Sequence, residues 1–275
     1  MSDVERGYQL PSLPPGDHAC IDIEFGYVYG TSRAVIMPVE IGAVIFRPSN
    51  GHAAEFAGEQ FCYDIEYEVW KKVTDGCGRT VGVSTSVFNN VTGECGKAYD
   101  HAFRLPGGRM AGAREVARSA FGDLRMFMEN LLSSGDTPAL IFFAADMERR
   151  AFLRAGVPLK GYEVIDLQQQ VKRALQMKEH LSLDRISRFI GFRTTRDGIA
   201  SDHFAYPVPQ KYRSLLDPHR GVGDAARIFM LSREFADNRA EFIERIRTVL
   251  ARCEECDGEC TNGFLNGNKG DGLKE

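Results

Sequence analysis

Two acidic residues, Asp22 and Glu24, lie two positions apart in the apolar segment ACIDIEFGYVYG, residues 19–30. A β-strand points alternate side chains to one face, so this spacing predicts that both carboxylates share a face of a sheet. Like charges on a buried strand are unfavourable unless a cation offsets them, and Mg²⁺ and Mn²⁺ favour carboxylate oxygens. The pair therefore predicts a divalent-metal site completed by further acids; an exposed sheet face is the alternative.

Two more acids and a histidine fit that expectation. Asp146 ends the buried-strand segment TPALIFFAAD, and Asp224 lies near the start of a late helix. His219 precedes Asp224 by five residues. Asp146 and Asp224 could therefore complete the predicted divalent-metal site, because carboxylate oxygens are the ligands that hard cations favour.

In this order, the segments resemble the motifs of the DEDDh group of 3′→5′ exonucleases, which is DnaQ-like and belongs to the ribonuclease H-like superfamily. The matching segments are CIDIE, PVEIGAVIF, IFFAADMERRAFL, LSLDRISRFIGF and HRGVGDA. They resemble, respectively, the first motif, the strand after it, the second motif, the helix before the third motif, and the third motif itself. The resemblance runs from about residue 19 to about residue 236 and is poor between residues 50 and 110.

The resemblance implies a ribonuclease H-like α/β fold, in which a mixed β-sheet is flanked by helices. It also implies hydrolysis supported by two Mg²⁺ or Mn²⁺ ions. The residues that it makes catalytic are Asp22, Glu24, Asp146 and Asp224 as metal ligands and His219 as the general base. The expected reaction releases nucleoside 5′-monophosphates from the 3′ ends of single-stranded DNA or RNA, and the sequence does not choose between the two.

Two residues depart from the family pattern next to the first motif. Phe25 and Gly26 occupy positions where relatives contact the terminal nucleotide, which makes them candidates for substrate binding. Phe25 could instead pack in the core, and Phe142 stands where many relatives have Asn. These changes keep open an alternative: an inactive module of the same fold that binds nucleic acid or protein. Glu40, on the second strand, is expected to support the structure rather than bind metal.

Other clusters have simpler interpretations. Cys253, Cys256 and Cys260 have a zinc-like spacing without a local fourth ligand, and free thiols at a helix end are the alternative. The Asp202–His203 pair is interpreted as part of a loop or cap. The glycine-rich segment GCGRTVG lacks the preceding strand of a nucleotide-binding loop.

Hydrophobic periodicity predicts the elements that position these residues. Strands are expected at 19–30, 35–46, about 53–61 and in the segment ending at Asp146; helices at 113–132, 147–156, 166–178, 182–192, 221–237 and 238–253. The first strands predict an antiparallel meander within a mixed sheet. We expect a polar lead-in at 1–17, one exonuclease-like domain at 18–252 with an irregular excursion at 62–111, and a Cys-containing, flexible tail at 253–275.

The composition of this 275-residue chain indicates its solubility class, its charge and its cellular compartment. The hydrophobic content of 43% and charged content of 26% are typical of a globular protein, and the net charge of −4 gives no general attraction to nucleic acid. Neither a signal peptide nor a membrane-spanning segment is expected. The odd number of cysteines, seven, favours reduced thiols in the cytoplasm or another reducing intracellular compartment. The oligomeric state stays open.

Overall fold

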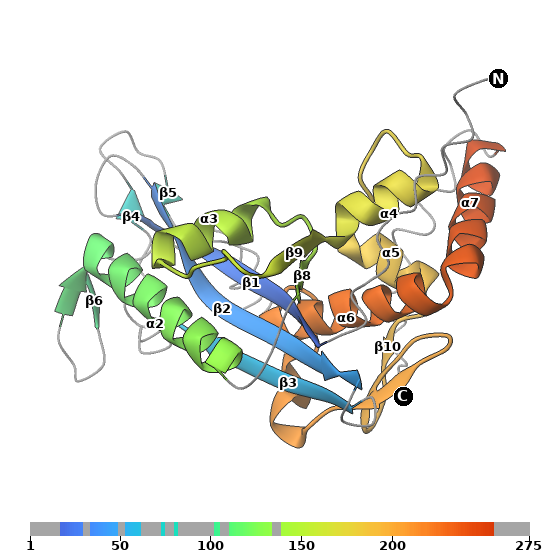
Figure 1. The fold of residues 1–275 in the computed structure, drawn as a ribbon. Helices are drawn as coiled ribbons and strands as arrows, with labels where there is room; N and C mark the ends of the chain where they lie inside the picture. Colours follow the sequence, from blue (N-terminus) through green and yellow to red (C-terminus); the bar gives the residue numbers. More distant parts are fainter. Residues whose placement is uncertain are drawn as a thin grey trace, which may run out of the picture.

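A mixed β-sheet with helices on both faces forms the framework of the computed structural model (Figure 1). The structure describes residues 17–29, 34–48, 53–61, 73–74, 80–81, 102–104, 110–133 and 139–255. The strands of the main sheet are β1 (His18–Tyr29), β2 (Ala34–Arg47), β3 (Ala53–Gln60), β8 (Ala139–Phe142) and β9 (Glu163–Asp166). The helices are α2 (Ala113–Ser133), α3 (Asp146–Ala155), α4 (Leu167–Leu175), α5 (Leu183–Phe189), η3 (Gln210–Leu215, a 3₁₀ helix), α6 (Gly221–Asp237) and α7 (Arg239–Glu255).

The five strands of the main sheet lie in the order β3-β2-β1-β8-β9. β1, β2 and β3 pair antiparallel, whereas β8 pairs parallel with both β1 and β9. The predicted antiparallel meander and the mixed α/β class are therefore confirmed. β1 is the central strand, so its side chains are covered from both faces.

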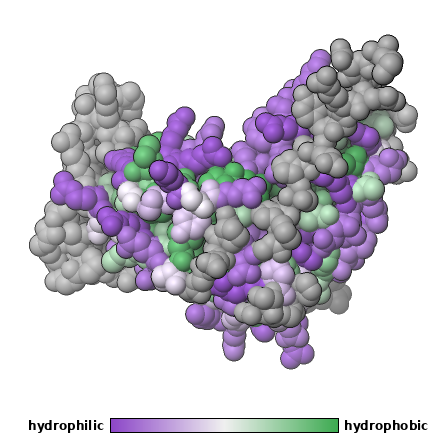
Figure 2. All heavy atoms as spheres, viewed as in Figure 1, coloured by the Kyte–Doolittle hydropathy of each residue, from purple (hydrophilic) through white to green (hydrophobic). Residues whose placement is uncertain are grey.

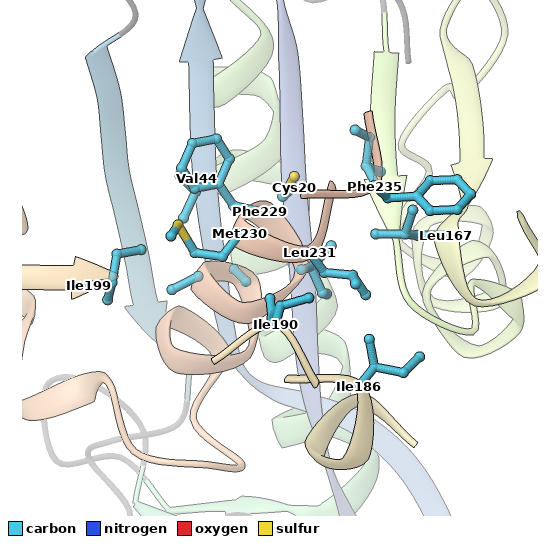
Figure 3. Packing of buried hydrophobic residues seen from close by; sticks show 14 of the residues in the cluster. Cys20, Val44, Leu167, Ile186, Ile190, Ile199, Phe229, Met230, Leu231 and Phe235 are labelled. Atoms are coloured by element: carbon cyan, nitrogen blue, oxygen red, sulfur yellow. The ribbon is translucent and has the colours of Figure 1, made fainter. Parts of the chain in front are cut away.

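Alternating residues of β1 pack into two different hydrophobic clusters. Ala19, Ile21 and Ile23 pack with α2 and α3 on one face of the sheet. Cys20 packs on the other face with α4 to α7, and Figure 3 shows it near Val44 and residues of α6. Asp22 and Glu24 continue the alternation of Cys20, so they share the face that α6 covers. This arrangement confirms the predicted common face of the two acids.

A β-bulge interrupts the pairing of β1 with β2 directly after these acids. Glu24 pairs with Glu40 but Phe25 pairs with Pro38, which leaves Val39 as the extra residue of β2. Proline has no N–H to donate to a sheet ladder, and bulges are where strands accommodate it. The bulge lets the strand pairing continue past the pair of acids.

Several elements were not predicted from the sequence. β8 ends at Phe142 rather than at Asp146, because the chain turns through Ala144, which has a left-handed φ of 62°. β9 has only four residues and owes its form to parallel pairing with β8. The other short strands are β4 (Val73–Thr74), β5 (Thr80–Val81), β6 (Ala102–Arg104), β7 (Met110–Gly112), β10 (Arg193–Thr194), β11 (Gly198–Ala200) and β12 (Ala205–Pro207). Such short pairs carry too little hydrophobic periodicity to be identified from sequence.

The predicted segment boundaries are only partly covered by the structure. The lead-in before Asp17 and the residues after Glu255 lie outside the described residues, as does most of the excursion at 62–111. Helix α7 continues to Glu255, so Cys253 belongs to the helix rather than to the tail. Cys256 and Cys260 lie outside the described residues.

Hydrophilic residues cover most of the described surface on the face shown in Figure 2. Among the described residues, no helix combines the length and the apolar character needed to cross a membrane. This agrees with the expectation that the chain has no membrane-spanning helix.

A buried carboxylate on α6 holds the loop that contains Asp202 and His203. Glu234 Oε1 accepts hydrogen bonds from the Ser201 hydroxyl (2.6 Å) and the His203 backbone N–H (3.1 Å). Glu234 Oε2 lies 2.8 Å from His203 Nδ1, and Glu241 on α7 lies 3.4 Å from His203 Nε2. The pair interpreted from sequence as a loop or cap therefore has a structural role, which is to tie the loop to α6 and α7.

These contacts make stability depend on pH. The hydrogen bond to Glu234 raises the pKa of His203 above its ordinary value of 6.5. The stabilising charge on His203 is therefore fully present below about pH 6.5 and is lost as the pH rises through the raised pKa. We expect the melting temperature to fall more between about pH 6 and about pH 8 in the wild type than in His203→Gln. Thermal denaturation across that range measures this, with the exposed His180→Gln as control; equal pH profiles for all three proteins would contradict it.

Candidate metal centre

Three of the residues predicted from sequence converge at the N-terminus of α6. Glu24 on β1, His219 in the loop before α6 and Asp224 in its first turn have possible ligand atoms all within 4.8 Å of one another. Glu24 is 8% exposed and Asp224 is 9% exposed, whereas His219 is open to solvent. The group thus has two buried carboxylates and one accessible imidazole.

Two glycines allow α6 to approach the sheet this closely. A Cβ on Gly42 of β2 would lie 2.1 Å from the carbonyl carbon of Gly221 and 2.2 Å from the nitrogen of Val222. Gly42 pairs with Asp22 across the β1–β2 ladder. The backbone of α6 therefore begins directly beside the strand position of Asp22, which places Asp224 near Asp22 and Glu24.

Glu40 fixes the start of α6 by hydrogen bonds. Its carboxylate accepts a bond from the Gly221 backbone N–H (2.8 Å), bonds from Arg220 Nε (3.0 and 3.2 Å) and a bond from the Gln60 amide (3.0 Å). The first N–H groups of a helix have no partner within the helix, and a carboxylate there is favoured by the helix dipole. Glu40 is thus engaged in support of the fold, as the sequence analysis expects.

The loop before α6 has an uncommon backbone conformation. His219 has a left-handed φ of 59°, in a region that few residues other than glycine adopt. Four residues later, a Cβ on Gly223 would lie 2.3 Å from the Asp217 carbonyl oxygen. The tight packing of this loop on the first turn of α6 therefore holds His219 in place beside Asp224.

Asp22 is surrounded by like charges. Burial raises its pKa well above the ordinary value of 3.8, and the negative charges of Asp224, Glu24, Glu148 and Glu40 raise it further. All four neighbours favour the neutral form of Asp22. A bound cation would reverse this preference, so the electrostatics of Asp22 fit a metal site.

Asp224 has a partial counter-charge within its own helix. Burial raises its pKa, while the Arg227 guanidinium and His219 act in the opposite direction. Arg227 Nη1 donates a 2.8 Å hydrogen bond to Asp224 Oδ1, and its guanidinium lies 5.1 Å from the centre of the Phe192 ring. One Asp224 oxygen is therefore engaged by a buried cationic side chain.

The structure does not place Asp146 in this group of acids. Asp146 is the first residue of α3 and is exposed to solvent, and it is not among the residues whose possible ligand atoms converge, which are Glu24, His219 and Asp224. A nearby acid that the sequence analysis passed over, Glu148, is buried. Burial raises the pKa of Glu148 to about 7; a hydrogen bond from its own backbone lowers it, and the charges of Asp166 and Asp146 raise it. The sequence could have indicated this burial, because Glu148 lies three and four residues before the apolar Ala151 and Phe152 and therefore on the same face of the helix.

The two substrate-binding candidates lie immediately beyond the acids on β1. Phe25 packs against the α2–α3 cluster, on the face of the sheet opposite to Asp22 and Glu24. Gly26 is buried and pairs with Met37. Of the two uses weighed for Phe25, this packing favours the core over base stacking.

Cys20, on the same strand as Asp22 and Glu24, has low reactivity. Cys20 is a buried free thiol, and burial raises its pKa to about 12. A thiol that stays protonated is a poor nucleophile and a poor metal ligand. Cys20 therefore belongs to the core beneath the site, and the reducing compartment stays a prediction from the cysteine content.

Comparison with known proteins gives no family assignment, since neither any protein-family model nor any curated protein matches the chain. The residues of the candidate metal centre are therefore the basis for assigning a function.

Proposed function

We propose that this protein is a metal-dependent 3′→5′ exonuclease of the DEDDh type with a ribonuclease H-like fold. The observation that carries the proposal is the convergence of Glu24, His219 and Asp224, whose possible ligand atoms lie within 4.8 Å of one another, beside Asp22 on the same strand as Glu24. Acids placed this close together are unfavourable unless cations offset them. The mixed sheet flanked by helices and the order of the sequence motifs are compatible with this assignment.

The residues suit a hard divalent cation. Carboxylate oxygens from Asp22, Glu24 and Asp224 are the ligands that Mg²⁺ and Mn²⁺ prefer. When bound, two such ions would supply Lewis-acid stabilisation of the negative charge that develops on the phosphate. They would also provide the positive charge that the chain, with its net charge of −4, lacks for binding a polyanion.

His219 has the position of a general base. Its imidazole is open to solvent and lies beside the carboxylates of Glu24 and Asp224. A neutral imidazole in this position could take a proton from a water molecule. Glu40 and the two contacting glycines, Gly42 and Gly221, hold the backbone from which His219 projects.

The test of the proposed function is the shortening of matched 5′-labelled DNA and RNA oligonucleotides in Mn²⁺. The wild type is expected to release mononucleotides stepwise from the 3′ end of at least one of them. His219→Ala should reduce the rate by roughly 10²–10⁴-fold, the usual contribution of a general base. His180→Ala, which removes another exposed histidine, should leave the rate unchanged. Equal rates for His219→Ala and the wild type would refute the assigned role.

The alternative function is an inactive module that binds nucleic acid or protein. Two observations favour it: Asp224 is already paired with Arg227, and the exposed Asp146 is not part of the group formed by Glu24, His219 and Asp224. Oligonucleotide binding without any shortening after long incubation in Mn²⁺ would support this alternative over the exonuclease.

A further inference from the structure

Helix α3 turns one acid inward and another outward. Its buried residues Glu148, Ala151 and Phe152 have the i, i+3, i+4 spacing of one helical face. Ala151 and Phe152 pack in the core with α2 and the sheet. Asp146 lies two residues before Glu148, about 200° away around the helix axis, and is exposed. The packing of α3 therefore selects Glu148, and not Asp146, for the interior.

One oxygen of the buried Glu148 carboxylate accepts no hydrogen bond from the described residues. The side chain is 7% exposed, and its Oε2 atom has no hydrogen-bond partner in the described part of the chain. The groups whose charges influence it, Asp166 and Asp146, are both acids. A buried polar atom without a partner destabilises the fold, and more strongly when it is charged. A cation bound by the carboxylate would provide the partner that this oxygen lacks.

Glu148 also lies close enough to Asp22 on β1 for its charge to act on that carboxylate. Its charge acts on Asp22, together with the charges of Glu24 and Asp224. The pairing of β1 with β8 ends at Cys20 and Ile141, so Asp22 lies just beyond the end of β8. The chain leaving β8 passes through residues 143–145 into α3, which brings the first turn of α3 toward this end of the sheet.

We propose that Glu148 is the carboxylate that α3 contributes to the metal centre and that Asp146 is not a ligand. The cation is a hard divalent ion held by oxygens of Asp22, Glu24, Asp224 and Glu148. This inference rests on the proposed function, because it names a ligand of the same site. It replaces the residue that the sequence motif alone selects.

Mn²⁺ titration of the full chain by isothermal calorimetry tests the assignment. Glu148→Gln removes the charge but keeps the size, and Asp146→Asn is the matched control on the same helix turn. We expect Glu148→Gln to weaken Mn²⁺ binding about tenfold or more, since even groups that only orient ligands change affinity by roughly 10–100-fold. Asp146→Asn should stay within about twofold of the wild type, because an exposed acid makes only a weak, solvent-screened contribution.

The outcomes separate this inference from the proposed function. If wild type and Glu148→Gln bind Mn²⁺ equally while Asp146→Asn binds more weakly, the assignment to Glu148 is wrong and the metal site stands. If the wild type does not bind Mn²⁺, both proposals are wrong. The melting temperature of the metal-free Glu148→Gln protein should be at least as high as that of the metal-free wild type. Should this variant fail to melt cooperatively, Glu148→Asp, which shortens the side chain, must show the same selective loss of Mn²⁺ affinity.

Discussion

Replacing Asp22 with Asn is expected to make the metal-free protein more stable and to remove most of the proposed nuclease activity. The pKa of Asp22 is raised by burial and by four neighbouring acids, so the folded protein binds a proton there more tightly than the unfolded chain does. Stability is therefore lost as the pH rises from about 3.8, the ordinary pKa, through the raised pKa. Asn carries no charge, so the variant escapes this loss.

Divalent metal should reverse the order of stability. Without metal at neutral pH, Asp22→Asn is expected to be about 1–2 kcal/mol more stable than the wild type, because it removes a buried charge that lacks a counter-ion. Mn²⁺ at one hundred times its dissociation constant would stabilise the wild type by about 2.7 kcal/mol and the variant much less. Loss of a ligand to the metal should also slow oligonucleotide shortening by about 10³-fold or more.

Thermal or urea denaturation in EDTA and in Mn²⁺ measures both effects. Asp197→Asn is the matched control, because Asp197 is an exposed acid whose contact with Arg213 is 3.7 Å long. It should change stability by only a few tenths of a kcal/mol, in the range of about 0.2–1 kcal/mol typical of exposed ion pairs. Equal stabilisation of wild type and Asp22→Asn by Mn²⁺ would show that Asp22 does not bind the metal.

Replacing Gly42 with Ala is expected to be the most destabilising single-methyl change near the site. The new Cβ would lie 2.1 Å from the Gly221 carbonyl carbon, and backbone atoms cannot move aside as a flexible side chain can. Overpacking in a core usually destabilises by about 1–3 kcal/mol, and we expect at least the upper end here because the clash is with backbone. Displacement of α6 would also separate His219 and Asp224 from Glu24.

Urea denaturation of Gly42→Ala beside Gly122→Ala isolates the effect of the contact. A Cβ on Gly122, in the exposed face of α2, would meet nothing within 4 Å. Gly122→Ala should stabilise the protein by about 0.5–1 kcal/mol, because alanine favours the helix. Both variants add one methyl group at a glycine, so similar unfolding midpoints would rule out a tight contact between β2 and α6.

The glycine contact explains why two sequence segments far apart in the chain belong together. Glu40 and Gly42 lie in PVEIGAVIF, and Arg220 and Gly221 lie in HRGVGDA. Glu40 supplies the carboxylate that binds the start of α6, and Gly42 leaves room on β2 for the α6 backbone. Arg220 and Gly221 supply the N–H groups that bind Glu40, and Gly221 packs against Gly42. The motifs are therefore linked by packing as well as by the chemistry of Asp22 and Asp224.

Local pattern was sufficient for the shared face of Asp22 and Glu24, since alternation along a strand depends only on neighbouring residues. It was also sufficient for the helix starts predicted at residues 166 and 182, where the Asp166 and Ser182 side chains each accept a hydrogen bond from the backbone N–H three residues further along. The antiparallel meander followed from consecutive strands with turn residues between them. In each case the interacting residues lie close together in the chain.

Tertiary structure decided which acid of α3 faces the interior and how the site is assembled. The direction of Asp146 and Glu148 depends on how the chain leaves β8, where Ala144 adopts a left-handed conformation that no local pattern indicates. The bond from Gly221 to Glu40 joins residues 181 positions apart. Sequence by itself determined the residue types that could bind a divalent metal, because those follow from chemistry and spacing. Only packing determined which of these residues meet, because that depends on contacts between distant segments.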